Sequence, residues 1–330
     1  MNSDNLRHPE EAEGRLEGRR FAGLGLHLGS VRRRFNRSLD LLSLLACVLI
    51  WGTTWFVIKL QLGSVDPTAS VVYRFALAGG VLVIVNRLRR APATLTLRQH
   101  LYTAGQGICV FALGYRLVYA AEAHAPSALV AVVWASLALI NLVVFAVLYR
   151  QVSPWPVWVG AVLGTLGVAA LSIGQILSSP VGSDLMLGVG LALASVGINA
   201  AGNLCTREGQ ALGTDITLST GAAMLYGTGA LVLYGLVTRV NFAAPLTLAY
   251  WGPLFYLSLL GSVAAFLLYY TLASRRGFTL ASYVGAMTPP VAMVVSSLFE
   301  HVEWGAAAFV GIGLILGGQF LVLRFSGAHK

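Results

Sequence analysis

The chain contains the apolar stretch WVGAVLGTLG at residues 158–167 and repeats its pattern as FVGIGLILGG at residues 309–318. A weaker match joins PSALVAVVW at residues 126–134 to TLASYVGAM at residues 279–287. Both pairs are about 151–153 residues apart. Because the two matches share nearly the same offset, they indicate that the chain consists of two copies of one unit.

The composition around these stretches is that of a membrane protein. Apolar residues make up 57% of the 330 residues and charged residues 11%, whereas a soluble domain has about 25% charged residues. A hydrocarbon core of roughly 30 Å takes about 20 apolar residues of helix per crossing. Turn-forming pairs such as Asp66-Pro67 divide the sequence into segments of that length. We therefore predict an all-α integral membrane protein with ten transmembrane helices, at residues 41–61, 68–88, 99–120, 127–148, 155–176, 184–204, 216–238, 250–271, 279–299 and 304–325.

The number of spans in each copy determines its orientation. Residues 39–176 form the first predicted five-helix repeat and residues 184–325 the second. Because five is odd, the second repeat enters the membrane from the opposite side. Inverted repeats of this kind are typical of transporters that work by alternating access.

Positive charge gathers on one side of the predicted spans. With the N-terminus inside, the cytoplasmic segments hold 18 of the 22 Lys and Arg residues, and the outer loops hold Arg239 alone. This asymmetry places both termini in the cytoplasm and accounts for the net charge of +9 without nucleic acid as a partner. Residues 1–38, with eight Arg, are predicted to be a disordered basic cytoplasmic tail.

The sequence lacks the residue patterns that several functional classes require. The cysteines Cys47, Cys109 and Cys205 have no metal-ligand spacing, and no catalytic triad, HExxH or phosphate-binding loop occurs. We therefore expect no catalytic residue, no metal and no cofactor, and we expect that the chain is not an enzyme. An intramembrane lipid-modifying enzyme and a passive channel stay open as alternatives to a transporter.

Three motifs point to a known family. The first span reads LIWGTTWFVIK at residues 49–59, the second contains YRFALAGG at residues 73–80, and residues 288–318 read TPPVAMVVSSLFEHVEWGAAAFVGIGLILGG. In order and spacing the chain, over about residues 40–325, resembles the EamA-type branch of the drug/metabolite transporter (DMT) superfamily. The resemblance implies export of small polar metabolites, often amino acids or their derivatives. The family also includes members for nucleotide sugars, sugar phosphates and drugs, so the resemblance does not identify the substrate. The family pattern has a proline in the fourth span that WASLALINLVV at residues 134–144 lacks, so a bend there does not follow from the sequence.

Charged residues inside the spans are few. Arg74 and Arg116 could each bind a substrate carboxylate through a guanidinium fork, or Arg74 could form a structural ion pair or cap backbone carbonyls. Lys59 either binds substrate or extends its ammonium to the interface. Glu122 and Glu300 end their spans, and no acid lies at the expected midplane, which argues against proton coupling through a carboxylate.

Aromatic and amide side chains are the other candidates for substrate contact. Trp51 and Trp55, like Asn199 and Asn203, are four residues apart and share one helix face. These pairs lie on the first helix of each repeat, so a cavity between them would offer rings on one side and amides on the other. An interfacial belt and interhelical hydrogen bonds are the alternatives. The full substrate-binding prediction is Trp51, Trp55, Tyr73, Arg74, Tyr115, Arg116, Trp134, Asn141, Asn199, Asn203 and Tyr283.

Two further patterns concern the helices themselves. Pro289 and Pro290 fall within the ninth span, where they predict a kink that lines the pathway and acts in gating. Gly160 with Gly164, and Gly313 with Gly317, predict close helix contacts in the fifth and tenth spans. Together these features predict a secondary transporter of the cell inner membrane, monomeric or homodimeric, that exports or exchanges small metabolites. Its expected partners are a small-molecule substrate and the lipid bilayer.

Overall fold

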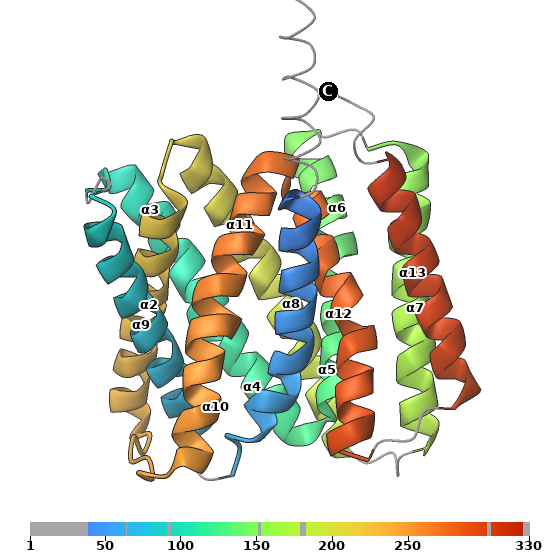
Figure 1. Cartoon of the computed structure of the whole chain (residues 1–330), viewed down its shortest axis with the longest axis horizontal. Helices are drawn as coiled ribbons and strands as arrows, with labels where there is room; N and C mark the ends of the chain where they lie inside the picture. Colours follow the sequence, from blue (N-terminus) through green and yellow to red (C-terminus); the bar gives the residue numbers. More distant parts are fainter. Residues whose placement is uncertain are drawn as a thin grey trace, which may run out of the picture. The chain divides into compact units, whose positions relative to one another are not determined.

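The computed structural model describes residues 39–63, 65–90, 94–150, 153–178, 183–301 and 305–325, which fold into helices with no strand among them (Figure 1). Residues Leu44–Lys330 belong to one compact unit, and every tertiary contact discussed below lies within it. The predicted basic tail, residues 1–38, lies outside the described part of the chain.

The helices follow one another with short connections. Their bounds are Leu39–Lys59, Pro67–Leu88 (α2), Leu97–Gln106 (α3), Gly107–Gly114 (η1), Tyr115–His124 (α4), Ser127–Trp134 (α5), Leu137–Tyr149 (α6), Trp155–Ser178 (α7), Ser183–Ala211 (α8), Ile216–Thr238 (α9), Leu248–Ser258 (α10), Leu259–Ala264 (η2), Ala265–Arg276 (α11), Phe278–Phe299 (α12) and Ala306–Phe325 (α13).

Six helical stretches of the described chain are long and apolar enough to cross a membrane: Leu39–Lys59, Pro67–Leu88, Ser127–Tyr149, Asp184–Ala211, Ile216–Thr238 and Leu248–Arg276. Shorter apolar helices lie at Trp155–Gly167, Tyr283–Phe299 and Ala306–Val322. The all-helical membrane fold is thus confirmed for the described residues, whereas ten crossings stays a prediction. The third predicted span, 99–120, is helical but is not among the six.

Helices α2 and α9 begin in the same way. The Asp66 carboxylate accepts a hydrogen bond from the Thr68 N–H at 2.7 Å, and the Asp215 carboxylate accepts one from the Leu218 N–H at 3.0 Å. An aspartate at this position satisfies an amide of the first turn and complements the positive end of the helix dipole. The two helices then pack closely along their length, where Gly79 lies against Leu225.

Two segments of the chain are π-helical, η1 at Gly107–Gly114 and η2 at Leu259–Ala264. Each is continuous with α-helix on both sides, and each falls in the third helix of its predicted repeat. Segments of π-helix are rare and often occur at functional sites, because they shift the register of the side chains that follow. The apolar sequences of η1 and η2 do not predict them.

Helices α7 and α13 lie side by side and touch through their backbones (Figure 1). A Cβ atom on Gly160 would lie 2.5 Å from the Gly318 carbonyl oxygen, and one on Gly318 would lie 2.3 Å from the Gly160 carbonyl oxygen. A Cβ atom on Gly167 would lie 2.5 Å from the Gly311 carbonyl oxygen. The pairing of Gly160 with Gly318 and of Gly167 with Gly311 means that the two helices run antiparallel.

The predicted close contact is therefore confirmed, but the predicted glycine pairs are wrong in part. Cβ atoms on Gly164, Gly313 and Gly317 would meet nothing within 4 Å. Glycines seven residues apart recur after two helical turns and meet the partner helix here, whereas Gly313 and Gly317 do not. The backbone nitrogen of Gly164 also lies at the contact, 2.9 Å from the position of a Cβ atom on Gly318.

We predict that Gly318→Ala destabilises the protein whereas Gly317→Ala does not. The new methyl group at position 318 would overlap the Gly160 carbonyl, and overpacking of this kind costs about 1–3 kcal/mol. The methyl group at position 317 would enter open space, and alanine is the better helix former. Thermal unfolding of the two purified variants in one detergent checks this, and equal melting temperatures would contradict it.

Candidate functional site

A cavity lies among the first helix, η1, α4, α5, α6, α8, α11 and α12. The empty space inside it, counted together with the open solvent at its mouth, is about 670 Å³. Its lining residues are Trp51, Thr54, Trp55, Ile58, Val110, Tyr115, Val118, Trp134, Leu137, Asn199, Asn203, Phe266, Tyr269, Tyr270, Gly285 and Thr288.

Aromatic rings form much of the wall. The Trp51 ring lies 5.2 Å from the Phe266 ring and 5.3 Å from the Tyr269 ring, measured between centroids. Its indole N–H donates to the Gly261 carbonyl of η2 at 3.1 Å. The Trp55 ring packs edge-on against Trp134 at 5.7 Å. Because the rings brace one another, the cavity presents rigid apolar faces to a ligand.

Helix α8 contributes polar groups to the cavity wall. The Trp134 N–H donates to the Ser195 hydroxyl, which donates to the Gly114 carbonyl, each at 3.1 Å. The Asn199 amide donates to the Ser195 carbonyl at 2.9 Å. These bonds hold Asn199 and Trp134 at the cavity, and the next turn of α8 adds Asn203.

Two of the lining side chains keep free hydrogen-bonding capacity. The Trp55 side chain is 8% exposed, and its indole N–H has no partner among the described residues. Asn203 is 4% exposed and has no side-chain hydrogen bond within the described part of the chain. A buried polar group without a partner is costly, so both are positioned to bind a polar group of a ligand.

Arg74 lies behind the wall and not in it. Its side chain is fully buried, with Nε donating to the Ser262 hydroxyl at 2.9 Å and Nη2 to the Gly261 carbonyl at 3.4 Å. The guanidinium carbon lies 4.6 Å from the centre of the Tyr115 ring, and Tyr115 lines the cavity. The structure thus agrees with the carbonyl-capping alternative. Nη1 has no hydrogen-bond partner in the described chain, so substrate contact for Arg74 stays a prediction.

Two helices with an irregular backbone ladder meet at the cavity. The fourth predicted span breaks at Ala135–Ser136, between α5 and α6, although it lacks a proline. The Ser136 hydroxyl donates to the Val133 carbonyl at 2.7 Å, a side-chain bond that competes with the helix ladder. Trp134 and Leu137 flank the break and line the cavity.

Helix α12 stays helical from Phe278 to Phe299, but one hydrogen bond of its backbone ladder is missing. Pro289 carries no N–H, so the Gly285 carbonyl lacks its normal donor four residues later. The Thr288 hydroxyl donates to that carbonyl instead, at 2.8 Å. Gly285 and Thr288 both line the cavity. Pro289 and Pro290 do not line it themselves, but they determine the backbone chemistry of the residues that do.

We predict that Thr288→Val destabilises the protein by about 1–3 kcal/mol, the cost of a buried carbonyl without a donor. In a Pro289→Ala background the restored N–H can reach the Gly285 carbonyl, and the same change should cost much less. Melting temperatures of the two single variants and the double variant check this. If Thr288→Val lowered the melting temperature equally in the two backgrounds, the hydroxyl would not be the replacement for the missing donor.

The remaining predicted site residues lie outside the cavity lining. The Tyr73 hydroxyl donates to the Phe242 carbonyl and ties down the loop before α10. Arg116 donates to the Tyr234 hydroxyl of α9 at 3.0 Å. Asn141 and Tyr283 are buried in α6 and α12. A direct substrate contact for these residues stays an untested prediction.

Sequence reasoning missed several lining residues. Most are apolar or small, such as Ile58, Val110 and Gly285, and carry no signal that separates a cavity from a packed core. Tyr269 and Tyr270 of α11 line the cavity as well. Helical spacing from Trp51 and Trp55 would have identified Thr54 and Ile58, because residues three and four apart share a face.

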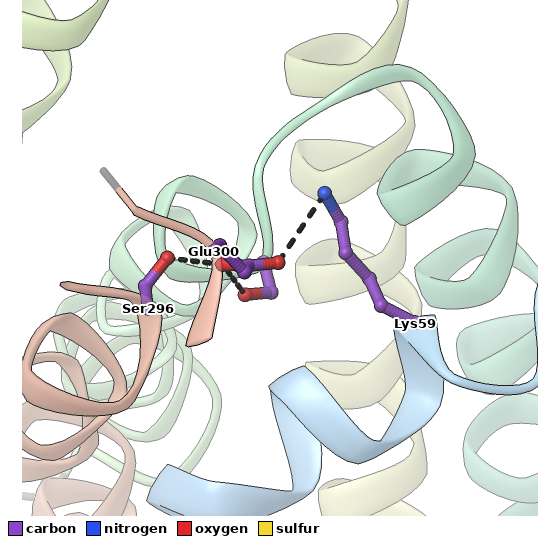
Figure 2. A network of polar contacts seen from close by, with 4 residues as sticks. Lys59, Ser296 and Glu300 are labelled. Carbon is purple, nitrogen blue, oxygen red and sulfur yellow. Dashed lines mark hydrogen bonds and ion pairs between the residues drawn. The ribbon is translucent and has the colours of Figure 1, made fainter. Parts of the chain in front are cut away.

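A charged cluster lies at one end of the first helix (Figure 2). The Lys59 ammonium lies 3.4 Å from a carboxylate oxygen of Glu300. The other oxygen of Glu300 accepts hydrogen bonds from the Ser127 hydroxyl at 2.7 Å and from the Ser296 hydroxyl. The cluster therefore joins the first helix, the start of α5 and the end of α12, and Lys59 does not simply extend to the interface.

The fold and the site define a polytopic α-helical membrane protein with an aromatic and amide-lined cavity between helices of both halves of the chain. The model of the EamA-like transporter family matches residues 38–173 and again residues 186–324. The chain belongs to this family, of the DMT superfamily, and contains its domain twice.

Named relatives and a solved structure agree with this assignment. The chain is 28% identical over 299 residues to the uncharacterized inner membrane transporter YedA of Escherichia coli, covering 86% of this chain and 92% of YedA. It is 24% identical over 278 residues to protein PecM of Dickeya dadantii, covering 84% and 90% of the two chains. A crystal structure with 17% identity superimposes with a TM-score of 0.70 over 89% of this chain and 99% of the other, which shows the fold alone.

Proposed function

We propose that the protein is a secondary transporter of the inner membrane that exports or exchanges small metabolites by alternating access. The observation that carries the proposal is the cavity, whose lining comes from the first helix and α4–α6 as well as from α8, α11 and α12. Residues of both family domains therefore bind the same substrate, and rocking of one repeat against the other would expose it to either side.

Reciprocal glycine contacts support the inverted repeat. In the sequence match, Gly160 corresponds to Gly311 and Gly167 to Gly318. The observed contacts are Gly160 with Gly318 and Gly167 with Gly311. Gly160 thus meets the counterpart of Gly167, and Gly167 meets the counterpart of Gly160. This reciprocal pattern is the contact pattern of a two-fold axis. Antiparallel counterparts are what an axis in the membrane plane requires.

The π-helical segments support the same symmetry. The start of η1 and the start of η2 are 152 residues apart, close to the offset of the sequence repeat. Each accepts a side-chain hydrogen bond from the first helix of the other copy, at Gly261 from Trp51 and at Gly114 from Ser195. Ten crossings, with both termini on one side of the membrane, follow if each copy contributes five. The distribution of Lys and Arg then places that side in the cytoplasm.

The lining chemistry favours amino acids or their derivatives as substrates. Trp51, Trp55 and Trp134 offer faces to an apolar or ring-bearing side chain, whereas Asn199 and Asn203 offer amides to a polar backbone. The Arg74 guanidinium behind Tyr115 has no ion-pair partner among the described residues, so its positive charge favours a substrate with a carboxylate.

Counterflow in proteoliposomes tests the proposal and its alternatives. Vesicles that contain the purified protein are preloaded with unlabelled amino acids, and entry of labelled phenylalanine is followed. Transient accumulation above equilibrium that requires internal substrate demonstrates alternating access. Entry without such accumulation indicates a passive channel, and a chemically altered label indicates a lipid-modifying or other enzyme.

We predict that Trp55→Phe weakens the apparent affinity for phenylalanine about fivefold to tenfold, since a lost hydrogen bond is worth about 1 kcal/mol. Because the indole N–H has no protein partner, the stability cost should be limited to the buried packing that the smaller ring loses against Trp134. Trp251→Phe is the control: that indole donates to the Pro245 carbonyl outside the cavity, and its loss should leave the affinity unchanged. An unaltered affinity in Trp55→Phe would contradict the role of this N–H.

We predict that a reporter that folds only in the cytoplasm is active when fused after Lys330 and inactive when inserted in the loop after Arg239. The charge asymmetry of the sequence is the physical reason. Activity of both fusions or of neither would contradict the five-plus-five inverted arrangement.

A further inference from the structure

Glu122 lies near the end of α4, and its carboxyl group takes no part in the proposed substrate contacts. Its side chain is 2% exposed, and neither oxygen has a hydrogen-bond partner among the described residues. Isolated carboxylates are rarely held this way, because removing an unpaired charge from water is costly. A carboxyl group so placed either binds a proton or meets a cation.

The charged neighbours of Glu122 come from several packed elements. The Lys59 ammonium, the Glu300 carboxylate and the Arg74 guanidinium all act on it electrostatically. On its own helix it faces Tyr119, whose hydroxyl donates to Gln61 at 3.0 Å. At the end of α4, His124 pairs with Asp184 of α8 at 3.1 Å, and Asp184 is exposed.

Glu122 and the charged cluster of Lys59 and Glu300 are adjacent to the substrate cavity. Ile58 lines the cavity and is followed by Lys59, while Val118 lines it one helical turn before Glu122. Lys59 is in turn bound by Glu300, which also binds Ser127 and Ser296 (Figure 2). A change in the charge of Glu122 therefore acts on contacts that join the first helix, α5 and α12 beside the cavity.

We infer that Glu122 is a proton-binding site that couples substrate movement to proton movement, an inference that rests on the proposed transport function. In the observed conformation Glu122 holds a proton and Lys59 is bound to Glu300. When Glu122 releases its proton to water, its carboxylate competes with Glu300 for the Lys59 ammonium. The contacts of Glu300 with Ser127 and Ser296 then weaken, and the cavity opens or closes at this end.

The first test needs no substrate. Dicyclohexylcarbodiimide reacts with protonated carboxyl groups in apolar surroundings, and mass spectrometry of the digested full-length protein locates the adduct. We expect modification of Glu122 that falls as the pH is raised, with little at Glu300, which is ion-paired, or at exposed Asp184. Absence of the adduct at Glu122, or an adduct independent of pH, would overturn the inference.

The second test compares transport by the wild type, Glu122→Gln and Asp184→Asn. In the wild type, a gradient of one pH unit should drive accumulation of labelled phenylalanine by up to about tenfold if one proton moves per substrate. Imposing the gradient in each direction shows whether proton and substrate move together or in opposite directions. Glu122→Gln mimics the protonated form, and we expect the substrate-loaded protonated form to exchange substrate without proton release. The variant should therefore keep counterflow and lose the response to the gradient, whereas Asp184→Asn should keep both.

The outcomes separate this inference from the transport proposal. Counterflow in the wild type that ignores both gradients would overturn coupling and leave the transporter intact. A gradient response that persists in Glu122→Gln would assign coupling to another group. If no probe exchanges at all, the substrate proposal fails, and the carbodiimide experiment still decides whether Glu122 binds a proton. That experiment also decides the matter if Glu122→Gln does not fold.

Discussion

Helical carbonyl groups around the cavity accept hydrogen bonds from side chains, and much of this structure depends on these bonds. Where no water reaches, each unsatisfied carbonyl costs several kcal/mol. Here side chains from other elements provide the donors. Gly261 accepts from Trp51 and Arg74, and Gly114 accepts from Ser195. In α12, Gly285 accepts from Thr288 within its own helix. All of these bonds lie at the cavity or directly behind it.

The helices differ in how they are held: α7 and α13 form a regular scaffold, whereas the helices around the cavity are irregular. The α7–α13 pair is regular helix held by glycine contacts between backbones, and close packing of this kind is stiff. The cavity helices contain π-helix, a break and two prolines instead. Side-chain hydrogen bonds can exchange partners during a movement, whereas a backbone-to-backbone contact cannot slide without a clash. Motion is therefore expected at the cavity and not at α7 and α13.

The sequence predicted those parts of the site that follow from helical geometry. Trp51 with Trp55, and Asn199 with Asn203, share faces because they are four residues apart, and all four line the cavity. It could not predict η1 and η2, whose carbonyls accept bonds from distant donors such as Ser195 and Arg74. Nor could it predict the break at Ser136, where a local side-chain bond competes with the helix ladder. It likewise could not place Tyr73 and Arg116, since pairing with Phe242 and Tyr234 depends on tertiary packing.

Dependence on tertiary packing also explains why the position of an acid along its predicted span was a poor guide to its burial. Glu122 and Glu300 end their helices, and a position near a helix end suggests contact with water. Glu122 is nevertheless buried, because the first helix, α2 and α12 place Lys59, Arg74 and Glu300 around it. Burial depends on how many helices surround a position as well as on its distance along one helix. A carboxyl group at the end of a span can thus be as isolated from water as one at the midplane, and the argument against proton coupling from the missing midplane acid loses its force.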